Sequence, residues 1–223
     1  PCASASSPVA ELVRSYPIRS VNVIAHIRKA TQGEVKLENT HPFQRELWGR
    51  YWIFAHNGNL LAYQPALSGR FLPVGSTDSE RAFCHILDTL AQRFPDGPPS
   101  PVALHSALRE LATTIGSHGE FNFLLSDGER LFAHCSSRLC YVVRKAPFPV
   151  AHLADEDVSV DFNEVTSPTD RVAIIVTTPL TDNEAWQQIP PGTLLAFHDG
   201  EPEALGETAT VAAPPGGRIS SPA

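Results

Sequence analysis

Three short segments of this sequence carry side chains that complement a free amino acid. Arg28 directly follows an apolar, strand-like run, and a guanidinium has the fork geometry that grips a carboxylate through two hydrogen bonds. Asp78 stands in the first turn of a helical pattern and offers an anion for an ammonium group. Asn57 and Gly58 offer a side-chain amide and a backbone N–H that together suit an oxyanion. These parts would hold an amino acid such as glutamine and allow hydrolysis of its side-chain amide.

Each residue also has an ordinary structural explanation, which stays open at this point. Asn-Gly is a common hairpin turn, because both residues tolerate positive φ. An arginine such as Arg28 at a strand exit is usually a surface charge. Asp78 complements the dipole of a helix N-terminus. Each segment alone is weak evidence for a chemical site, and only the three together favour the chemical explanation.

Composition limits the function classes. The 223 residues suffice for one globular domain, and the hydrophobic and charged fractions, 42% and 18%, are ordinary for a soluble enzyme. The formal net charge of -7 argues against a nucleic-acid partner. No apolar run approaches the ~18 residues of a membrane span, and residues 1–8 do not resemble a secretory signal. The cysteines form no CxxC pair, which predicts free thiols and a cytoplasmic location.

The elements that must position the three segments are predicted as strands around two adjacent helices. A capping box at Thr77 and Glu80 begins one helix, and Ser100-Pro101 begins another that stops near Gly116. A further short helix is expected over 8–16. Strands are expected over 21–27, 51–56, 120–136 (a hairpin turning at Asp127-Gly128), 139–146, 171–180 and 193–201. Consecutive strands without crossover helices predict antiparallel sheets, and the apolar run 172–176 predicts burial between layers.

Four motifs, in this order and spacing, resemble those of the class II glutamine amidotransferases: "HIRKATQG", "NTHPF", "AHNGNL" and "STDSE". The stretches "ENTHPFQRELWGRYWIFAHNG", "FNFLLSDG" and "LTDNEAWQQIPPG" are similar to the small stand-alone bacterial members. The resemblance covers residues 7–200. It implies an α+β N-terminal-nucleophile hydrolase fold, an αββα sandwich of two mainly antiparallel sheets between helical layers. We expect this domain over residues 1–205, followed by a disordered tail, 206–223.

The resemblance also implies a role for each matching residue. Arg28 would bind the α-carboxylate of glutamine, and Thr31 would line the same pocket. Asn57 and Gly58 would form the oxyanion hole, and Asp78 would bind the α-amino group. The expected partner is glutamine or a γ-glutamyl small molecule, with no cofactor, metal, nucleic acid or membrane. A separate ammonia-accepting protein and a homodimer are both compatible with this resemblance.

The nucleophile of the family is a cysteine at the first position of the mature chain, with its own α-amine as the base. Here Pro1 is first and Cys2 second, followed by the small polar run "ASASSP". We therefore expect that the family's opening segment, with its nucleophile and first strands, is missing from this sequence. Such a chain would have unpaired sheet edges and an incompletely covered core, so we expect it to be marginally stable, prone to aggregation or completed by another piece, and to lack glutaminase activity.

Three other functions remain as alternatives. His26, His41 and His56 recur near the proposed pocket, and three imidazoles hold a catalytic zinc in some hydrolases. A second alternative is a module that binds glutamine through Arg28 and Asp78 without turnover. A third is hydrolysis of γ-glutamyl amides of peptides or thiols, whose head group those two residues would grip in the same way.

Overall fold

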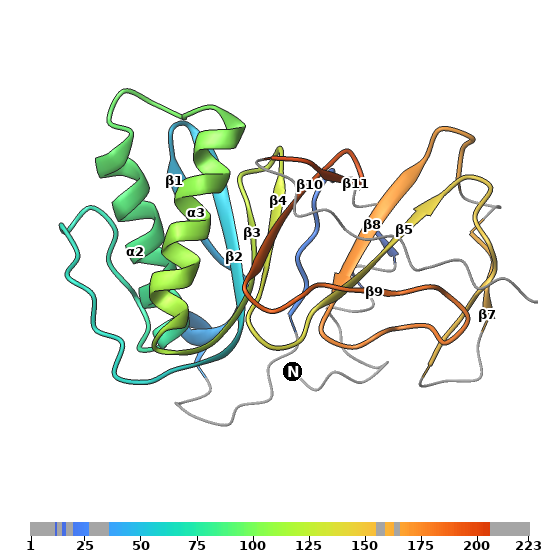
Figure 1. Cartoon of the computed structure of the whole chain (residues 1–223), viewed down its shortest axis with the longest axis horizontal. Helices are drawn as coiled ribbons and strands as arrows, with labels where there is room; N and C mark the ends of the chain where they lie inside the picture. The colour runs from blue at the N-terminus through green and yellow to red at the C-terminus, as the bar shows by residue number, and fades with distance from the viewer. Residues whose placement is uncertain are drawn as a thin grey trace, which may run out of the picture.

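The chain folds into two antiparallel sheets with helices against one of them, an α+β arrangement (Figure 1). The computed structural model describes residues 12, 15, 16, 20–26, 36–154, 159–162 and 166–205. The predicted α+β fold with two antiparallel sheets is confirmed. The tail 206–223 and most of the helix expected over 8–16 lie outside the described residues, so the domain bounds stay a prediction.

The larger sheet has six strands in the order β1-β2-β3-β4-β10-β11, and every neighbouring pair is antiparallel. Its strands are β1 (Phe43–Leu47), β2 (Arg50–Leu60), β3 (Gly119–Ser126), β4 (Leu131–Cys135), β10 (Thr193–His198) and β11 (Glu201–Glu203). The predicted hairpin is confirmed as β3 and β4, because Asp127 closes their turn by accepting the Arg130 N–H at 2.7 Å.

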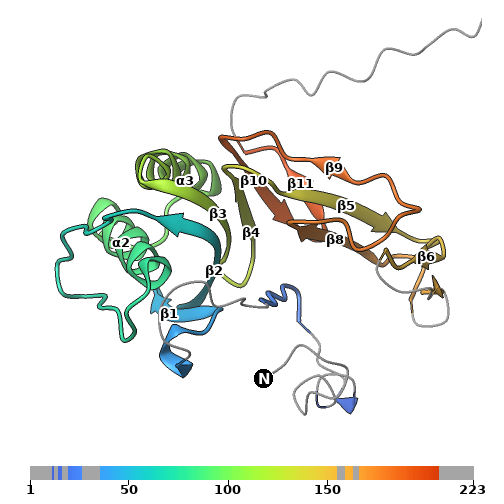
Figure 2. The same cartoon turned by 90° about the horizontal axis from the view of Figure 1, so that it is seen from below.

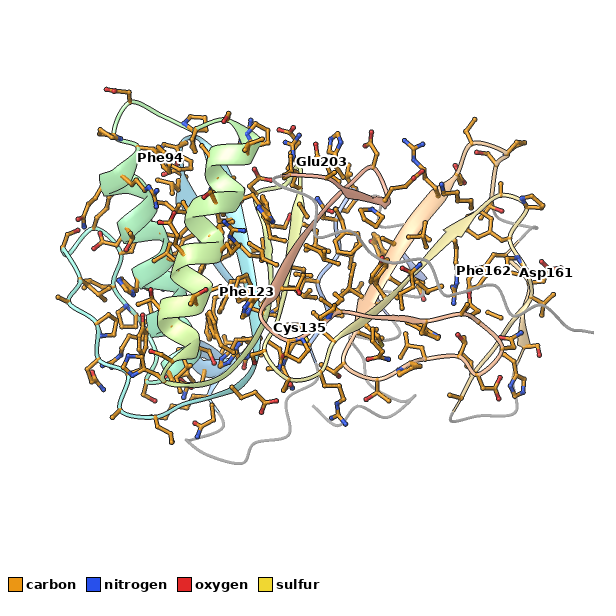
Figure 3. All side chains as sticks on the ribbon, viewed as in Figure 1. Phe94, Phe123, Cys135, Asp161, Phe162 and Glu203 are labelled. Carbon is orange, nitrogen blue, oxygen red and sulfur yellow. The ribbon has the colours of Figure 1, made fainter. Side chains whose placement is uncertain are left out.

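The smaller sheet extends away from the helices (Figure 2). Its strands, in the order β8-β5-β9, are β8 (Arg171–Val176), β5 (Cys140–Lys145) and β9 (Gln187–Gln188), and a separate pair is formed by β6 (Ala151–His152) and β7 (Ser159–Val160). A buried ion pair fastens the β8–β9 loop to β5, because Arg144 reaches Glu184 through Nε at 2.7 Å and Nη2 at 2.5 Å. The Arg144 guanidinium also lies over the ring of Phe162, which Figure 3 shows at the end of the molecule far from Phe94.

Helices α2 (Asp78–Arg93) and α3 (Pro101–Gly116) begin where the sequence predicts, and a single 3-10 turn, η1 (Leu37–Asn39), precedes β1. Thr77 caps α2 by accepting the Glu80 N–H at 3.2 Å. Ser100 caps α3 by accepting the Ala103 N–H at 3.3 Å. Both helices lie on the same face of the larger sheet (Figures 1 and 2).

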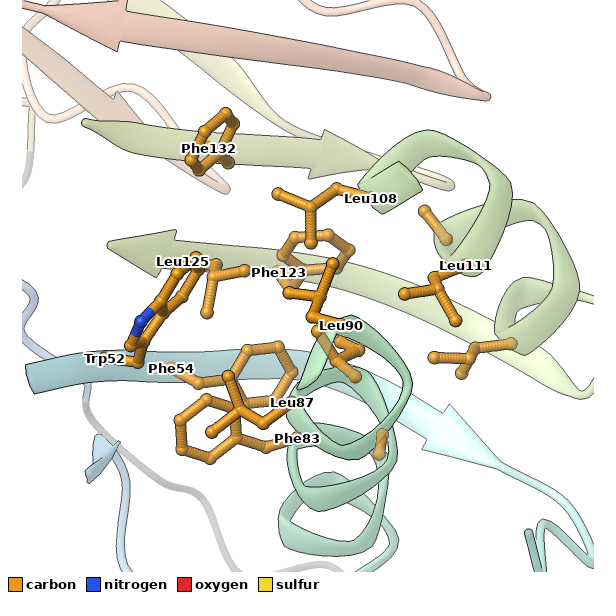
Figure 4. Close-up of a cluster of buried hydrophobic side chains, with 14 of the residues drawn as sticks. Trp52, Phe54, Phe83, Leu87, Leu90, Leu108, Leu111, Phe123, Leu125 and Phe132 are labelled. Carbon is orange, nitrogen blue, oxygen red and sulfur yellow. The ribbon is translucent and has the colours of Figure 1, made fainter. Parts of the chain in front are cut away.

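The main hydrophobic core fills the layer between these helices and the larger sheet (Figure 4). Phe54 of β2 stacks on Phe83 of α2 with ring centroids 5.2 Å apart, and Phe123 of β3 packs beside Phe54. Leu87 and Leu108 add aliphatic volume from the two helices, and both are fully buried. This core packs α2 against β2.

Two local predictions are wrong because they ignored which strand pairs with which. The Asn57-Gly58 pair is not a turn: β2 runs through it to Leu60, and Gly58 pairs opposite Phe121 of β3. Conversely, residues 21–26 form no regular element where a strand was expected over 21–27. Val23 there is 71% exposed, and strand-forming residues make a strand only where a partner strand is present.

Two further predictions are wrong about the sheets. No strand was expected between residues 27 and 51, but β1 lies there and pairs with β2. The apolar run of β8 was expected to be buried between layers. Instead β8 is an edge strand, none of its residues is fully buried, and Val172 is 41% exposed. Apolar character alone cannot indicate whether a second layer covers a strand.

Candidate active site

The structure brings two of the three predicted segments together. Asn57 and Gly58 lie near the end of β2, which finishes at Leu60, and Asp78 is the first residue of α2. Oδ2 of Asp78 accepts a hydrogen bond from the Leu60 N–H at 2.7 Å. One side chain therefore ties the helix start to the strand end that carries the Asn-Gly pair.

The third segment lies outside the part of the chain that the structure describes. This applies to Arg28 and Thr31, the residues predicted to hold the α-carboxylate, and to Cys2. Their roles therefore stay predictions.

Asp78 presents a half-buried carboxylate that the backbone already orients. Oδ1 accepts the Ser79 N–H at 2.8 Å, while Oδ2 accepts the Leu60 N–H. Each carboxylate oxygen has two lone pairs, so the group can also accept hydrogen bonds from an ammonium. It lies in the first turn of α2, where negative charge complements the helix dipole. The structural explanation of Asp78 is therefore compatible with the chemical one, and its role in binding an ammonium group stays a prediction.

His56 links β2, β3 and α2 from the inside of the protein. Its Nε2 lies 2.9 Å from the carbonyl oxygen of Glu120, and a carbonyl only accepts, so Nε2 carries the proton. Nδ1 is then the acceptor for the Ser79 hydroxyl at 2.8 Å. Burial lowers the pKa of His56, which agrees with a neutral ring in this tautomer.

Gly58 occupies a place that no other residue fits. Its φ of +152° lies in a region that side chains disfavour. A Cβ there would overlap the carbonyl oxygen of Glu120 and crowd Nε2 of His56. The glycine is therefore required by a close approach between β2 and β3, and not by a hairpin turn.

The loop between β2 and α2, residues 61–77, is held in place by side chains. The buried Glu80 accepts the N–H groups of Val74 at 3.0 Å and Gly75 at 2.7 Å, and its carboxylate pairs with Arg45 at 2.5 Å. The predicted capping box is therefore only half confirmed: Thr77 caps the helix, but Glu80 holds the loop in place.

Two more anchors complete this loop. Asn39, from the "NTHPF" motif, is 1% exposed and accepts the Ser76 N–H at 2.9 Å. Asp88, in the middle of α2, accepts the Ser68 N–H at 2.7 Å. The segment that leads into Asp78 is therefore fixed from both η1 and α2.

The zinc alternative finds no support in the described residues. The rings of His26 and His41 lie with centroids 4.4 Å apart. His56 faces Ser79 and Glu120. Across the described part of the chain, no three His, Cys, Asp or Glu side chains form a group that could hold a metal ion.

The three described cysteines are buried free thiols, as predicted. Burial raises the pKa of Cys84 to about 11, and burial also raises the pKa of Cys135 and of Cys140. Because the thiolate is the nucleophilic form, none of these three is suited to attack a substrate.

Two other features lie apart from the Asn57–Asp78 region. A cavity of about 550 Å³ lies against β8 and is lined by Asn22, Arg171 and Phe197 among others, but by none of the predicted site residues. No helix among the described residues is both long and apolar enough to cross a membrane.

Sequence reasoning missed Ser79 and Asn122, which surround this region. Ser79 contacts His56 and Asp78, and the side-chain amide of Asn122 bonds the carbonyl of Asn57 at 3.1 Å. One signal was available for Asn122: asparagine is depleted in strands, yet it interrupts the otherwise apolar run 121–125.

Comparisons with known proteins agree on one family. A family model described as class II glutamine amidotransferases matches residues 1–218. The Escherichia coli (strain K12) protein "Putative glutamine amidotransferase YafJ" is 52% identical over 201 residues, covering 90% of this chain and 79% of that protein. A Haemophilus influenzae "Putative glutamine amidotransferase" is 50% identical over 200 residues, covering 89% and 67%. The crystal structure of a "predicted glutamine amidotransferase" from Pseudomonas aeruginosa PA01 has a TM-score of 0.72 at 48% identity, covering 80% of this chain and 70% of that one.

Proposed function

We propose, since this chain belongs to the class II glutamine amidotransferases, that its site binds glutamine and serves hydrolysis of the side-chain amide. The observation that carries the proposal is the hydrogen bond between Asp78 and the Leu60 N–H. It brings an anion for the α-ammonium group to the strand end that holds Asn57 and Gly58.

The predicted site residues contact different parts of the glutamine molecule. Arg28 grips the α-carboxylate, with Thr31 beside it, and Asp78 accepts hydrogen bonds from the α-ammonium. The side-chain amide of Asn57 and the N–H of Gly58 stabilise the oxyanion that forms at the side-chain carbonyl. Removing one such donor typically costs about 10²–10³ in rate.

The chemistry proceeds by covalent catalysis at an N-terminal cysteine. Its thiol adds to the side-chain carbonyl carbon and gives its proton to the chain's own α-amine, which passes a proton to the leaving ammonia. The resulting thioester is hydrolysed by water to glutamate and the free thiol. The three described cysteines are buried, so the nucleophile must come from outside the described residues.

Calorimetric titration with L-glutamine tests the binding half of the proposal. We expect Asp78→Asn to weaken binding roughly 10- to 100-fold, because a charge-assisted hydrogen bond contributes about 1.5–3 kcal/mol. Asp96→Asn is the matched control, since Asp96 is an exposed carboxylate in the turn between α2 and α3. Absence of glutamine binding, or equal affinity in both variants, would refute the assignment of Asp78.

A diazoketone analogue of glutamine tests the covalent half. Intact mass and peptide mapping would locate any adduct. An adduct on Cys2 identifies the nucleophile within this sequence. Glutamine binding with neither adduct nor ammonia release instead favours the binding module. Stronger competition by γ-glutamyl amides of peptides or thiols than by glutamine would assign the site to those substrates.

A further inference from the structure

Asn122 of β3 is a buried polar residue with every hydrogen-bonding group engaged. It is 2% exposed. Its Oδ1 accepts the N–H groups of Ser136 at 2.9 Å and Ser137 at 3.1 Å. Its Nδ2 donates to the carbonyl oxygen of Asn57 at 3.1 Å and to Oγ of Ser137 at 2.9 Å. Oε1 of Glu120 is a third, longer acceptor for Nδ2, at 3.3 Å.

These partners decide the orientation of the amide without ambiguity. The Ser136 and Ser137 N–H groups only donate, so the atom that faces them must be the oxygen. The Asn57 carbonyl only accepts, so the atom that faces it must be the nitrogen. The side chain of Asn122 therefore connects the turn after β4 to one peptide group of β2 through hydrogen bonds.

That peptide group is the one that joins Asn57 to Gly58. In a trans peptide the carbonyl and the next N–H point in opposite directions. Because the Asn57 carbonyl points toward Asn122 on β3, the Gly58 N–H points away from β3.

The opposite residue gives an independent indication of the same direction. Gly58 pairs with Phe121, whose N–H donates to Oγ of Ser136 at 2.7 Å and whose carbonyl accepts from Nδ1 of His134 at 2.7 Å. Both polar groups of Phe121 thus face β4. In an antiparallel ladder such a pair exchanges no hydrogen bonds, so Phe121 does not occupy the Gly58 N–H.

We infer that Asn122 is a positioning residue for the oxyanion site, because its side chain adds a hydrogen bond to the Asn57 carbonyl, which the β2–β3 ladder already directs toward β3, and so holds the Gly58 N–H facing away from β3. The bond to the carbonyl also polarises the peptide and makes its N–H a better donor. This inference rests on the proposed function for its catalytic meaning, but the fixed peptide itself is a property of the free protein.

The sequence offers a specific spectroscopic test. Asn57-Gly58 is the only Asn-Gly pair in the chain, so protein labelled with ¹³C-carbonyl asparagine and ¹⁵N-glycine gives one carbonyl-to-amide correlation, from this peptide. Asn122→Asp keeps the shape and the acceptor but replaces the donor with an oxygen. We expect its ¹³C signal to move upfield through loss of the hydrogen bond, whereas Ser137→Ala, which leaves the Nδ2–Asn57 bond intact, should barely move it.

A second measurement needs no variant. In the unsubstituted, uniformly labelled protein, a through-hydrogen-bond coupling should join Nδ2 of Asn122 to the carbonyl carbon of Asn57. An unmoved peptide signal in Asn122→Asp, or absence of this coupling, would overturn the inference even if glutamine binds.

Glutamine titration separates this inference from the proposed function. In the unsubstituted protein, saturating glutamine should shift the Gly58 amide. In Asn122→Asp that response should shrink, while the Kd stays within about threefold because the head group supplies most of the affinity. If saturating glutamine leaves the Gly58 signal of the unsubstituted protein unmoved, the proposed function is wrong. The hydrogen bond from Asn122 to the Asn57 carbonyl, measured without glutamine, is not affected by that outcome.

Discussion

At the residue scale, Gly58 shows how one missing side chain shapes the site. A Cβ at this position would overlap the Glu120 carbonyl, and the φ of +152° disfavours any side chain. We expect Gly58→Ala to lower the free energy of unfolding by more than about 1 kcal/mol and to weaken glutamine binding, because the displaced strand end also carries the Leu60 N–H that orients Asp78. Urea denaturation and calorimetry measure the two effects.

The matched control is Gly116→Ala at the end of α3, where a Cβ meets nothing within 4 Å. Alanine is the better helix former, so this change should leave the stability unchanged or raise it by up to about 1 kcal/mol. Equal losses in both variants would show that the close approach of β2 and β3 is not the cause.

His56 gives a second prediction at this scale, because burial lowers its pKa. Above the unfolded pKa of about 6.5 the ring is neutral in both states. As the pH falls below that value, the unfolded chain takes up the proton first, so the folded state loses stability. The slope contributed by one such group is at most about 1.4 kcal/mol per pH unit.

We therefore expect the free energy of unfolding to fall between pH 7 and 5, and His56→Gln to flatten that slope. Burial lowers the pKa of His134 in the same direction, so His134→Gln should flatten the slope separately. Denaturant titrations at several pH values measure both slopes. A slope that His56→Gln leaves unchanged would contradict the neutral, buried imidazole.

At the scale of elements, the helix start that presents Asp78 depends on Thr77. Its hydroxyl accepts the Glu80 N–H, so Thr77→Ala should cost about 1 kcal/mol of stability. Thr113→Ala in the exposed last turn of α3 is the control, because its hydroxyl only bonds back to the Arg109 carbonyl at 3.0 Å. Chemical denaturation should show a change within about 0.5 kcal/mol for the control; similar losses in both would exclude a capping role.

Elements that depend on local signals were predictable from the sequence. Thr77 and Ser100 begin helices, and Asp127 closes a hairpin, because each uses a backbone group only a few residues away. The Asn57-Gly58 pair has the sequence of a turn but lies in a strand, because its partner strand β3 is more than sixty residues further along the chain. Pairing over such a distance outweighs the local preference for a turn and cannot be seen in the local sequence.

The candidate site was predictable to a similar degree. The types of Asn57, Gly58 and Asp78 suggested a joint role, and the structure brings them together through the Leu60 N–H. Arg28 and Thr31 remain predictions. Asn122 was not predictable, because an asparagine in a strand shows its purpose only when the carbonyl it bonds, that of Asn57, is known.

At the scale of the whole molecule, the two sheets should differ in stability. The helices bury β2 and β3 in the main core, whereas β8 is an edge strand with no fully buried residue. Local opening is easiest where few apolar side chains are buried. In native-state hydrogen exchange we expect the amides of β2 and β3 to exchange more slowly than those of β5 and β8. Equal protection of both sheets would indicate a single cooperative unit.

The anchoring of the loop 61–77 has a consequence for protein engineering. Its fastening groups, Glu80 and Asp88, belong to α2, whereas Asn57 and Gly58 belong to a paired strand. The loop and the Asn57–Gly58 peptide are therefore held by different parts of the fold. A loop of different length, grafted between Leu60 and Thr77 with the contacts to α2 retained, should leave the Asn-Gly peptide in its place in the sheet.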